Sequence, residues 1–234
     1  MTHRAIRALL LVIGLAAPAG AQDYHGKFTS GVYSADGQQS ADVNVRYALG
    51  GWTAWAGWYG PHADTRQART GLEYDLKRPG LVFTPSVQLA SRGFAGLSLY
   101  SEVGRKAYVI AGLSRTNLAP YMNLTFDPNE SWQLGGGVHL GKSDSVAGFT
   151  IWDNRLHTGQ QNTHVILRHY WPGAKRLTAD VSYKSGRDDS GVRLTGLGTA
   201  GEFDDRRWFV KVAHDPHANF SEPGMWRLGG GFRF

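Results

Sequence analysis

The stretch Trp226-Arg227-Leu228-Gly229-Gly230-Gly231-Phe232-Arg233-Phe234 decides the fold. Two arginines, Arg227 and Arg233, fall on one set of alternate positions. The other set holds the apolar residues Trp226, Leu228, Phe232 and Phe234. Successive side chains of a β-strand point to opposite faces, so the stretch predicts a strand with one apolar and one ionic face.

The same period of two residues recurs in segments of about ten residues along the chain. The clearest is 176–184, where Leu177, Ala179, Val181 and Tyr183 alternate with ionic and hydroxyl residues. Other segments with this pattern are 42–49, 67–76, 131–141 and 163–171. Sequences rich in Gly, Pro, Asn and Asp separate them and predict tight turns. The longer connections, expected to be surface loops, are 60–66, 157–162, 200–205 and 215–224. The series therefore predicts consecutive antiparallel strands.

These features predict an all-β fold, a transmembrane antiparallel β-barrel of 12 to 14 strands with short turns. About fifteen segments can be counted, but bacterial single-chain barrels close with an even number of strands. The weakest segments are 24–33 and 117–126. A soluble β-sandwich would also alternate, but it would bury its apolar face and would not require an aromatic last residue.

The last strand resembles that of Gram-negative outer-membrane β-barrel proteins, which ends in Phe after apolar residues at alternate positions. The resemblance implies that the barrel-assembly machinery recognises the strand ending at Phe234, and that outer-membrane lipid and lipopolysaccharide surround the barrel. In general form, the size and the Arg-rich polar face resemble small monomeric oligosaccharide porins. The Gly- and aromatic-rich strands resemble YaiO-type barrels, which are associated with envelope polysaccharide export. Neither likeness supplies a residue-specific motif.

The first residues are typical of a cleavable secretory signal peptide. Arg4 and Arg7 precede an apolar run over 8–17, and Ala19-Gly20-Ala21 follows it. The run is about half the ~20 residues of a membrane-spanning helix, which disfavours a retained anchor. We expect a signal peptide over 1–21, cleavage after Ala21, and one outer-membrane β-barrel domain over 22–234.

Composition narrows the classes of partner. Beyond residue 21 the chain has 23 Lys and Arg and 19 Asp and Glu, a net charge of +4 that is dispersed along the sequence. A nucleic-acid partner is not expected, because no clustered basic face or recognition motif is present. The glycine triplets at 135–137 and 229–231 lie inside expected strands and do not form phosphate-binding loops, so no cofactor is expected. The histidine spacing suggests no metal site.

The polar face of the strands is the expected barrel lumen, and basic residues predominate on it. Excess Arg and Lys lowers the electrostatic barrier for anions, so the sequence favours a channel or porin that passes small anionic solutes. The resemblance to oligosaccharide porins implies saccharides as the other class of solute. We expect lumen glycines such as Gly135 and Gly231 to widen the lumen. The alternative is a closed structural barrel in which these charges pair across strands. The candidate lumen and solute-binding residues are Arg46, Arg69, Glu73, Arg168, Lys184, Arg193 and Lys211.

An outer-membrane lipid-modifying enzyme, an acyl hydrolase, is the alternative from another class. If a hairpin turns near Gly173, His164 lies opposite Ser182, and Asp180 is one diagonal step away. These three residues are the candidates for base, nucleophile and orienting acid. Their parity points them into the lumen, whereas the barrel lipases and lipid A deacylases that they would resemble present theirs toward lipid. Catalysis is therefore the less favoured hypothesis.

Aromatic residues on the apolar face lie mainly near expected strand ends. Trp and Tyr at such positions are typical of the girdles that flank the lipid-facing band of a membrane barrel. The residues expected to form these girdles are Trp52, Trp58, Tyr74, Trp132, Trp171, Tyr183, Trp208, Trp226 and Phe234.

Overall fold

The computed structural model describes residues 25–60, 66–125, 127–155 and 158–234, so the expected signal peptide lies outside the described residues. The strands are short and consecutive, as the turn sequences predict. In chain order they are β1 (Gly26–Ala35), β2 (Gln38–Leu49), β3 (Trp52–Tyr59), β4 (Gln67–Tyr74), β5 (Leu76–Arg78), β6 (Leu81–Ala90), β7 (Phe94–Gly104), β8 (Ala107–Thr116), β9 (Ser131–Leu140), β10 (Asp144–Asp153), β11 (Gln161–Trp171), β12 (Lys175–Arg187), β13 (Arg193–Asp204), β14 (Trp208–Asp215) and β15 (Met225–Arg233).

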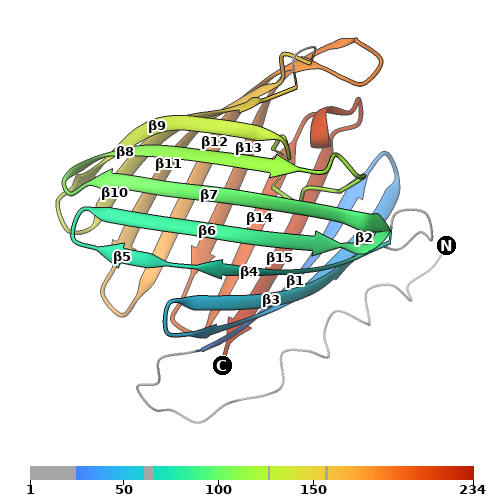
Figure 1. The fold of residues 1–234 in the computed structure, drawn as a ribbon. Helices are drawn as coiled ribbons and strands as arrows, with labels where there is room; N and C mark the ends of the chain where they lie inside the picture. The colour runs from blue at the N-terminus through green and yellow to red at the C-terminus, as the bar shows by residue number, and fades with distance from the viewer. Residues whose placement is uncertain (1–24, 61–65, 126, 156–157) are drawn as a thin grey trace.

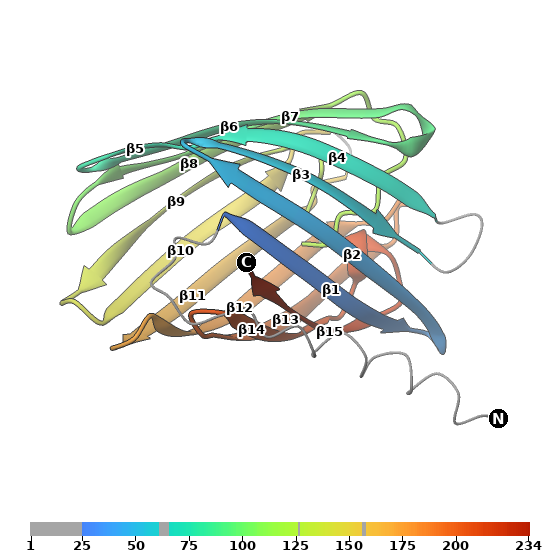
Figure 2. The ribbon, with the colours of Figure 1, turned by 90° about the horizontal axis from the view of Figure 1, so that it is seen from below.

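The strands form one closed antiparallel sheet (Figures 1 and 2). Almost every strand pairs with its neighbours in sequence, and β1 pairs with β15 to bring the two ends of the chain together. β4 and β5 both pair with β6 and are two halves of one strand, interrupted at Asp75. The barrel therefore has 14 strands, and the predicted fold class is confirmed.

The break at Asp75 falls inside the single segment 67–76 expected from sequence, so the one segment too many in the count is 117–126. The Asp75 carboxylate accepts hydrogen bonds from Thr84 Oγ1 at 2.7 Å and from Lys77 Nζ at 2.8 Å. Of the two weakest segments, 24–33 largely coincides with the strand β1, whereas 117–126 contains no strand among its described residues. A further expected surface loop, 200–205, instead lies almost entirely in β13.

The apolar face of each strand points away from the barrel axis. Large apolar side chains of this face, including Val181, Leu197 and Leu228, are about half exposed because nothing in the chain covers them. Trp226 is 58% exposed, and Trp132 stacks on Trp152 with ring centroids 4.1 Å apart. The expected girdle residues are all on this outward face; Tyr74 is half-buried beside Trp52.

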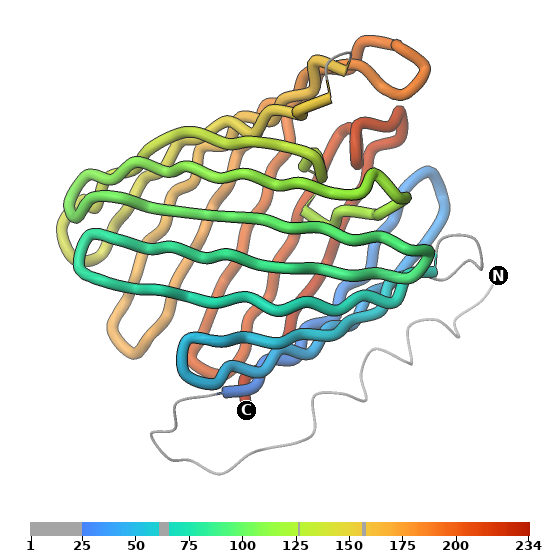
Figure 3. Tube along the Cα trace, in the orientation of Figure 1, coloured from blue at the N-terminus to red at the C-terminus, as the bar shows by residue number. Residues whose placement is uncertain are grey.

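The connections differ between the two ends of the barrel (Figure 3). At the end that holds the C-terminus, here called the terminal end, the strands are joined by turns of two or three residues. At the other end, here called the loop end, the longest connections are 117–130 and 216–224. In the described part of the chain, no helix is long and apolar enough to cross a membrane.

The lumen glycines do not widen the barrel, contrary to the expectation from sequence. A side chain at Gly137 would collide with the Tyr108 ring, and one at Gly71 would lie 2.5 Å from the Trp55 ring. Aromatic side chains of adjacent strands thus lie flat over these glycines. The absence of a side chain lets bulky rings pack against the wall.

Candidate functional site

The lumen carries a network of ion pairs on the wall formed by β11–β15 and β1–β4. At the terminal end, Arg233 and Arg176 share the Asp204 carboxylate, at 2.8 and 2.9 Å. Arg176 also pairs with Glu202 at 2.9 Å. These partners come from three different strands, so the network crosslinks β12, β13 and β15 along one side of the lumen.

Two of the predicted lumen residues form a second ion pair. Arg46 of β2 reaches across β3 to Glu73 of β4, with 2.6 Å between Nη2 and Oε2, and its guanidinium lies 6.0 Å from the centre of the Trp55 ring. Both side chains remain partly exposed to the lumen. The pair was not anticipated, because residues that are two strands apart have no local signal in the sequence.

Lys184 was expected to contact solute, but its side chain is buried in the structure. Its side chain is 1% exposed; Nζ donates to the Asp215 carboxylate at 2.6 Å and to the His217 carbonyl at 2.9 Å. The Phe220 ring covers it, with Nζ 4.8 Å from the ring centre. Lys184 therefore has a structural position in the lumen wall.

Other lumen cations have no carboxylate within ion-pair distance among the described residues: Lys27, Arg168, Lys211 and Arg227. Lys27 Nζ lies 4.3 Å from the centre of the Phe209 ring. Lys211 faces the lumen from β14, next to Glu202 in register on β13. Lys27, Lys211 and Arg227 lie on the neighbouring strands β1, β14 and β15, whereas Arg168 lies apart from them on β11.

The overall lumen charge is nearer to balance than the sequence suggests. Glu202, Asp204 and Asp215 face inward on β13 and β14 and were missed because the sequence was interpreted as loop there. Arg193 was expected in the lumen, but it lies on the outward set of β13, opposite Arg187 and exposed at the loop end. The residues of β13 that point into the lumen have even numbers, so Arg193, with an odd number, points outward.

The connection 117–130 folds into the lumen and joins opposite walls. On one side, Arg69 Nη1 donates to the Tyr121 hydroxyl at 3.4 Å, and Gln67 Nε2 donates to the Pro120 carbonyl at 3.3 Å. Arg227 of β15 donates to the Leu124 carbonyl. The sequence pattern suggested a weak strand over 117–126, and nothing within the segment indicated its inward course.

The second long connection, 216–224, also turns inward and packs on the first. Ala218 joins a buried apolar cluster with Tyr33, Tyr59 and Met225, and Met122 and Leu124 pack against the cluster. Asn219 Oδ1 accepts from the backbone N–H of Asn123 at 3.2 Å. Together the two connections occupy the lumen beside β1–β4 at the loop end.

The far end of the connection 117–130 is held by His164. His164 Nε2 lies 3.1 Å from Asp127 Oδ1, and Nδ1 lies 3.1 Å from both oxygens of Asp180. Asn162 Nδ2 donates to Asp127 Oδ1 at 2.7 Å. With a carboxylate at each ring nitrogen, both nitrogens can donate only as imidazolium. Asp127 thus joins the connection to β11 through a charge-assisted bond.

Burial and bonding act in opposite directions on Asp127. Burial would raise the pKa of its carboxyl, but hydrogen bonds from His164 and Asn162 and the charges of His164 and Lys184 hold the pKa below its ordinary value. The connection is therefore docked through an ionised carboxylate at neutral pH.

The same geometry bears on the catalytic alternative. The register confirms that His164 lies opposite Ser182, and Asp180 contacts His164. Both ring nitrogens of His164 nevertheless face carboxylates, so neither is placed to take a proton from Ser182. The arrangement has the geometry of a buried ionic cluster and lacks that of a nucleophile–base pair. No group of three or more His, Cys, Asp or Glu suited to a metal ion was found within the described ranges.

The opposite wall, formed by β6–β9, carries hydroxyl and amide side chains. A cavity of about 120 Å³ lies between this wall and the connection 117–130, and it is lined by residues that include Gln88, Phe94, Ser98, Ser114 and Tyr121. A second cavity, of about 170 Å³, lies further along the same wall, against Tyr100, Ser131 and Gln133. The part of this wall that lines the two cavities carries no Asp, Glu, Lys, Arg or His and is here called the uncharged wall. Glu102 lies further along β7, beside Tyr100.

Comparison with known proteins identifies the fold. No protein-family model matches the sequence, and no curated protein matches it significantly. The outer membrane protein Omp33 of Acinetobacter baumannii aligns with a TM-score of 0.56 at 10% identity, over 90% of this chain and 98% of that one. The NanC porin aligns with a TM-score of 0.50 at 8% identity, over 89% of this chain and 100% of its own.

A variant of the porin of Rh. blastica aligns equally well, with a TM-score of 0.50 at 9% identity, over 89% of this chain and 99% of that one. At such identities the likeness is one of fold. The chain is a closed β-barrel of the kind found in outer-membrane porins, and the expected structural resemblance to such proteins is confirmed.

Proposed function

We propose that this chain is a channel of the bacterial outer membrane through which small hydrophilic solutes diffuse. The observation that carries the proposal is the combination of an apolar outer face with a lumen full of ionisable and hydroxyl side chains. Charged groups are costly in a dry interior, so a barrel with Lys27, Lys211 and Arg168 inside without ion-pair partners needs water there. With 14 strands, it lies between the filled 8-strand barrels and the 16- to 18-strand porins with open channels.

The orientation and export route belong to the same proposal. Bacterial barrels carry short turns on the periplasmic side and longer loops outside, so the terminal end would face the periplasm. The chain would be exported by a signal peptide cleaved after Ala21, and the assembly machinery would recognise the strand that ends at Phe234. Lipid and lipopolysaccharide would then surround the outward face.

A modest preference for anions is expected from the lumen cations without carboxylate partners. Lys211 is the best test of this preference, because it faces the lumen and has no ion pair among the described residues. Arg193 is a matched control, since it is also basic but points outward at the rim.

Planar bilayers with the refolded protein provide the experiment. We expect stable openings and a reversal potential, in a salt gradient, that favours anions. Lys211→Gln should shift the reversal potential toward zero, while Arg193→Gln should leave it unchanged. A folded protein that never conducts would contradict the proposal and leave the closed structural barrel. Equal shifts in both variants would show that the selectivity does not arise in the lumen.

A further inference from the structure

Four serines of adjacent strands lie in one row across the uncharged wall of the lumen. Ser86 of β6 pairs in register with Ser98 of β7, Ser98 pairs with Ser114 of β8, and Ser114 pairs with Ser131 of β9. The Ser86 and Ser98 hydroxyl oxygens are 2.7 Å apart. Neighbouring strands are about 4.8 Å apart, so the backbone positions of the four serines span about 14 Å across the wall.

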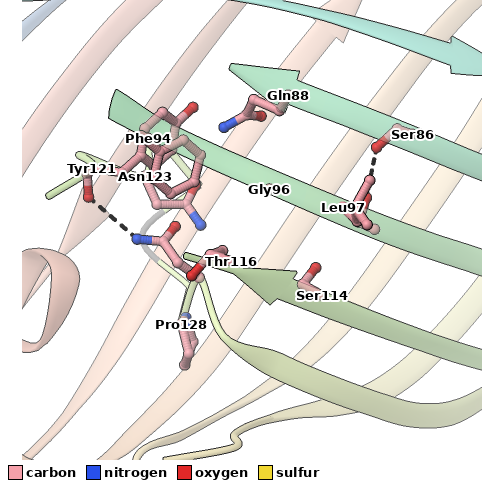
Figure 4. Close-up of a pocket in the computed structure, with 12 residues that line it drawn as sticks. Ser86, Gln88, Phe94, Gly96, Leu97, Ser114, Thr116, Tyr121, Asn123 and Pro128 are labelled. Atoms are coloured by element: carbon pink, nitrogen blue, oxygen red, sulfur yellow. Dashed lines mark hydrogen bonds between the residues drawn. The ribbon is translucent and has the colours of Figure 1, made fainter. Parts of the chain in front are cut away.

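Both lumen cavities open onto this row. The cavity against the connection 117–130 touches Ser86, Ser98 and Ser114, and the second touches Ser98, Ser114 and Ser131. Figure 4 shows the first cavity, with Ser114 and Thr116 on one strand, Gln88 on another, and Asn123 on the connection. The residues lining the two cavities include no Asp, Glu, Lys, Arg or His.

Several groups on this wall have hydrogen-bonding capacity that the protein does not use. Across the described ranges, no partner is found for the Ser114 hydroxyl or for the side-chain amides of Gln88 and Gln133. A hydroxyl and a primary amide can each donate and accept. The hydroxyl groups of a polyhydroxylated solute can also donate and accept, so such a solute can form hydrogen bonds with this wall in either role.

Most charged residues near these cavities have hydrogen-bond partners, whereas Arg168, whose charge acts on Tyr100, has no carboxylate within ion-pair distance in the described ranges. Glu130 accepts from Thr116 Oγ1 at 2.9 Å and pairs with Arg115, and Arg69 donates to the Tyr121 hydroxyl. Glu102 accepts from the Tyr100 hydroxyl. An anionic solute would find no cation among the residues that line the two cavities, so its desolvation there would not be compensated.

An aromatic pair completes the first cavity. Phe94 stacks on Tyr121 with ring centroids 4.2 Å apart and an interplanar angle of 19°. Both residues line the cavity, so an apolar surface lies beside the hydroxyl and amide groups (Figure 4). Binding sites for small molecules commonly combine apolar and aromatic walls with a few placed polar groups.

We propose that the uncharged wall, with the serine row at its centre, is a binding site for a neutral polyhydroxylated solute of the size of a small saccharide. The inference rests on the proposed channel function and names the solute class that would use it. The solute crosses on the β6–β9 side, since the inward connections occupy the β1–β4 side at the loop end. The charged residues of the opposite wall keep water in the lumen and determine which small ions pass.

Interruption of the ion current by added solute tests the inference on channels in planar bilayers. The neutral disaccharide lactose should block the current with a saturating concentration dependence, and polyethylene glycol of matched size should give only a linear reduction. Ser98→Ala/Ser114→Ala should raise the half-blocking lactose concentration about tenfold, as two lost hydrogen bonds require. Ser101→Ala, which changes the outward side of β7, should leave it unchanged.

The results separate this inference from the channel proposal. Conducting channels on which lactose acts no differently from polyethylene glycol would overturn the binding site and leave the channel standing. Stronger block by glucuronate than by lactose, relieved by Lys211→Gln, would assign the solute to the charged wall. Absence of conductance in the wild-type protein would overturn the channel proposal itself. Normal salt conductance in the double serine variant would show that it has folded.

Discussion

Lys184 is the lumen cation whose charge is most completely enclosed by protein. Removing one partner of a buried ion pair leaves the other charge uncompensated, at a cost of about 3–5 kcal/mol. We expect Lys184→Met to lower the free energy of unfolding by about this amount, measured by urea unfolding in detergent. Reversal potentials should not change, because the side chain is 1% exposed.

The partner variant gives the control for this prediction. Lys184→Met/Asp215→Asn removes both charges, so it should recover most of the lost stability. A single variant as stable as the wild type, or one with altered ion selectivity, would show that Lys184 meets the solution after all.

A substitution at Gly231 tests whether neighbouring groups pack closely against the glycines of the lumen wall. A Cβ there would collide with the Phe28 carbonyl and lie 2.8 Å from the Phe209 ring, so something must move. We expect Gly231→Ala to lower the unfolding free energy by about 1–3 kcal/mol. Gly201→Ala is the matched control, because its nearest neighbour would be Val212 Cγ1 at 4.0 Å. Equal stability of the two variants would contradict the packing argument.

At the level of single residues, the alternation of side chains could be predicted but their partners could not. Parity correctly placed Arg46, Arg69 and Lys211 in the lumen. It misplaced Arg193, because the start of β13 was not recognised. The ion pairs of Arg46 with Glu73 and of Lys184 with Asp215 join residues 27 and 31 positions apart, and only the register of the closed barrel brings them together.

The inward connection 117–130 is expected to respond to acid. Its Asp127 has a lowered pKa, so the stabilisation it contributes is fully present above the ordinary Asp pKa of about 3.9 and is lost as the pH falls through the lowered value. Below about pH 4 the connection should detach and the single-channel current should rise. Current traces recorded from pH 7 to pH 3 measure this change.

Asp127→Asn is the control for the acid response, because it cannot ionise. Its current at pH 7 should already resemble that of the wild type in acid, and the step below pH 4 should be absent. A variant that keeps the acid step would place the titrating group elsewhere among the lumen carboxylates.

Among the elements, strands could be predicted and inward connections could not. A strand can be recognised from the local sequence, because apolar residues that face lipid alternate with polar residues that face the lumen. The connection 117–130 is held by contacts with Gln67, Arg69, His164 and Arg227, which lie on three other strands. No pattern within the segment encodes those contacts.

For the molecule as a whole, closure depends on the pairing of β1 with β15. The backbone N–H of Gly26 donates to the Phe234 carbonyl at 2.7 Å, and the N–H of Phe234 donates to the Gly26 carbonyl at 2.9 Å. The Phe234 ring occupies the space that a side chain at position 26 would take. This last ring therefore helps to join the two ends of the sheet.

We expect Phe234→Ala to reduce the fraction of protein that folds into lipid bilayers, as measured by the gel mobility of unheated samples. Phe83→Ala is the matched control, since Phe83 is an outward aromatic within β6 and away from the closing strands. If the two variants fold equally well, the terminal aromatic has no special part in closure.

The inward course of both long connections also determines what the barrel displays to its surroundings. At the loop end the β12–β13 hairpin extends beyond its neighbours (Figure 3), and it carries Asp189 with a side chain that is 95% exposed. This hairpin would be the most accessible site for antibodies, phages and proteases that approach from that side. An epitope tag inserted after Asp189 would be accessible without disturbing the interior.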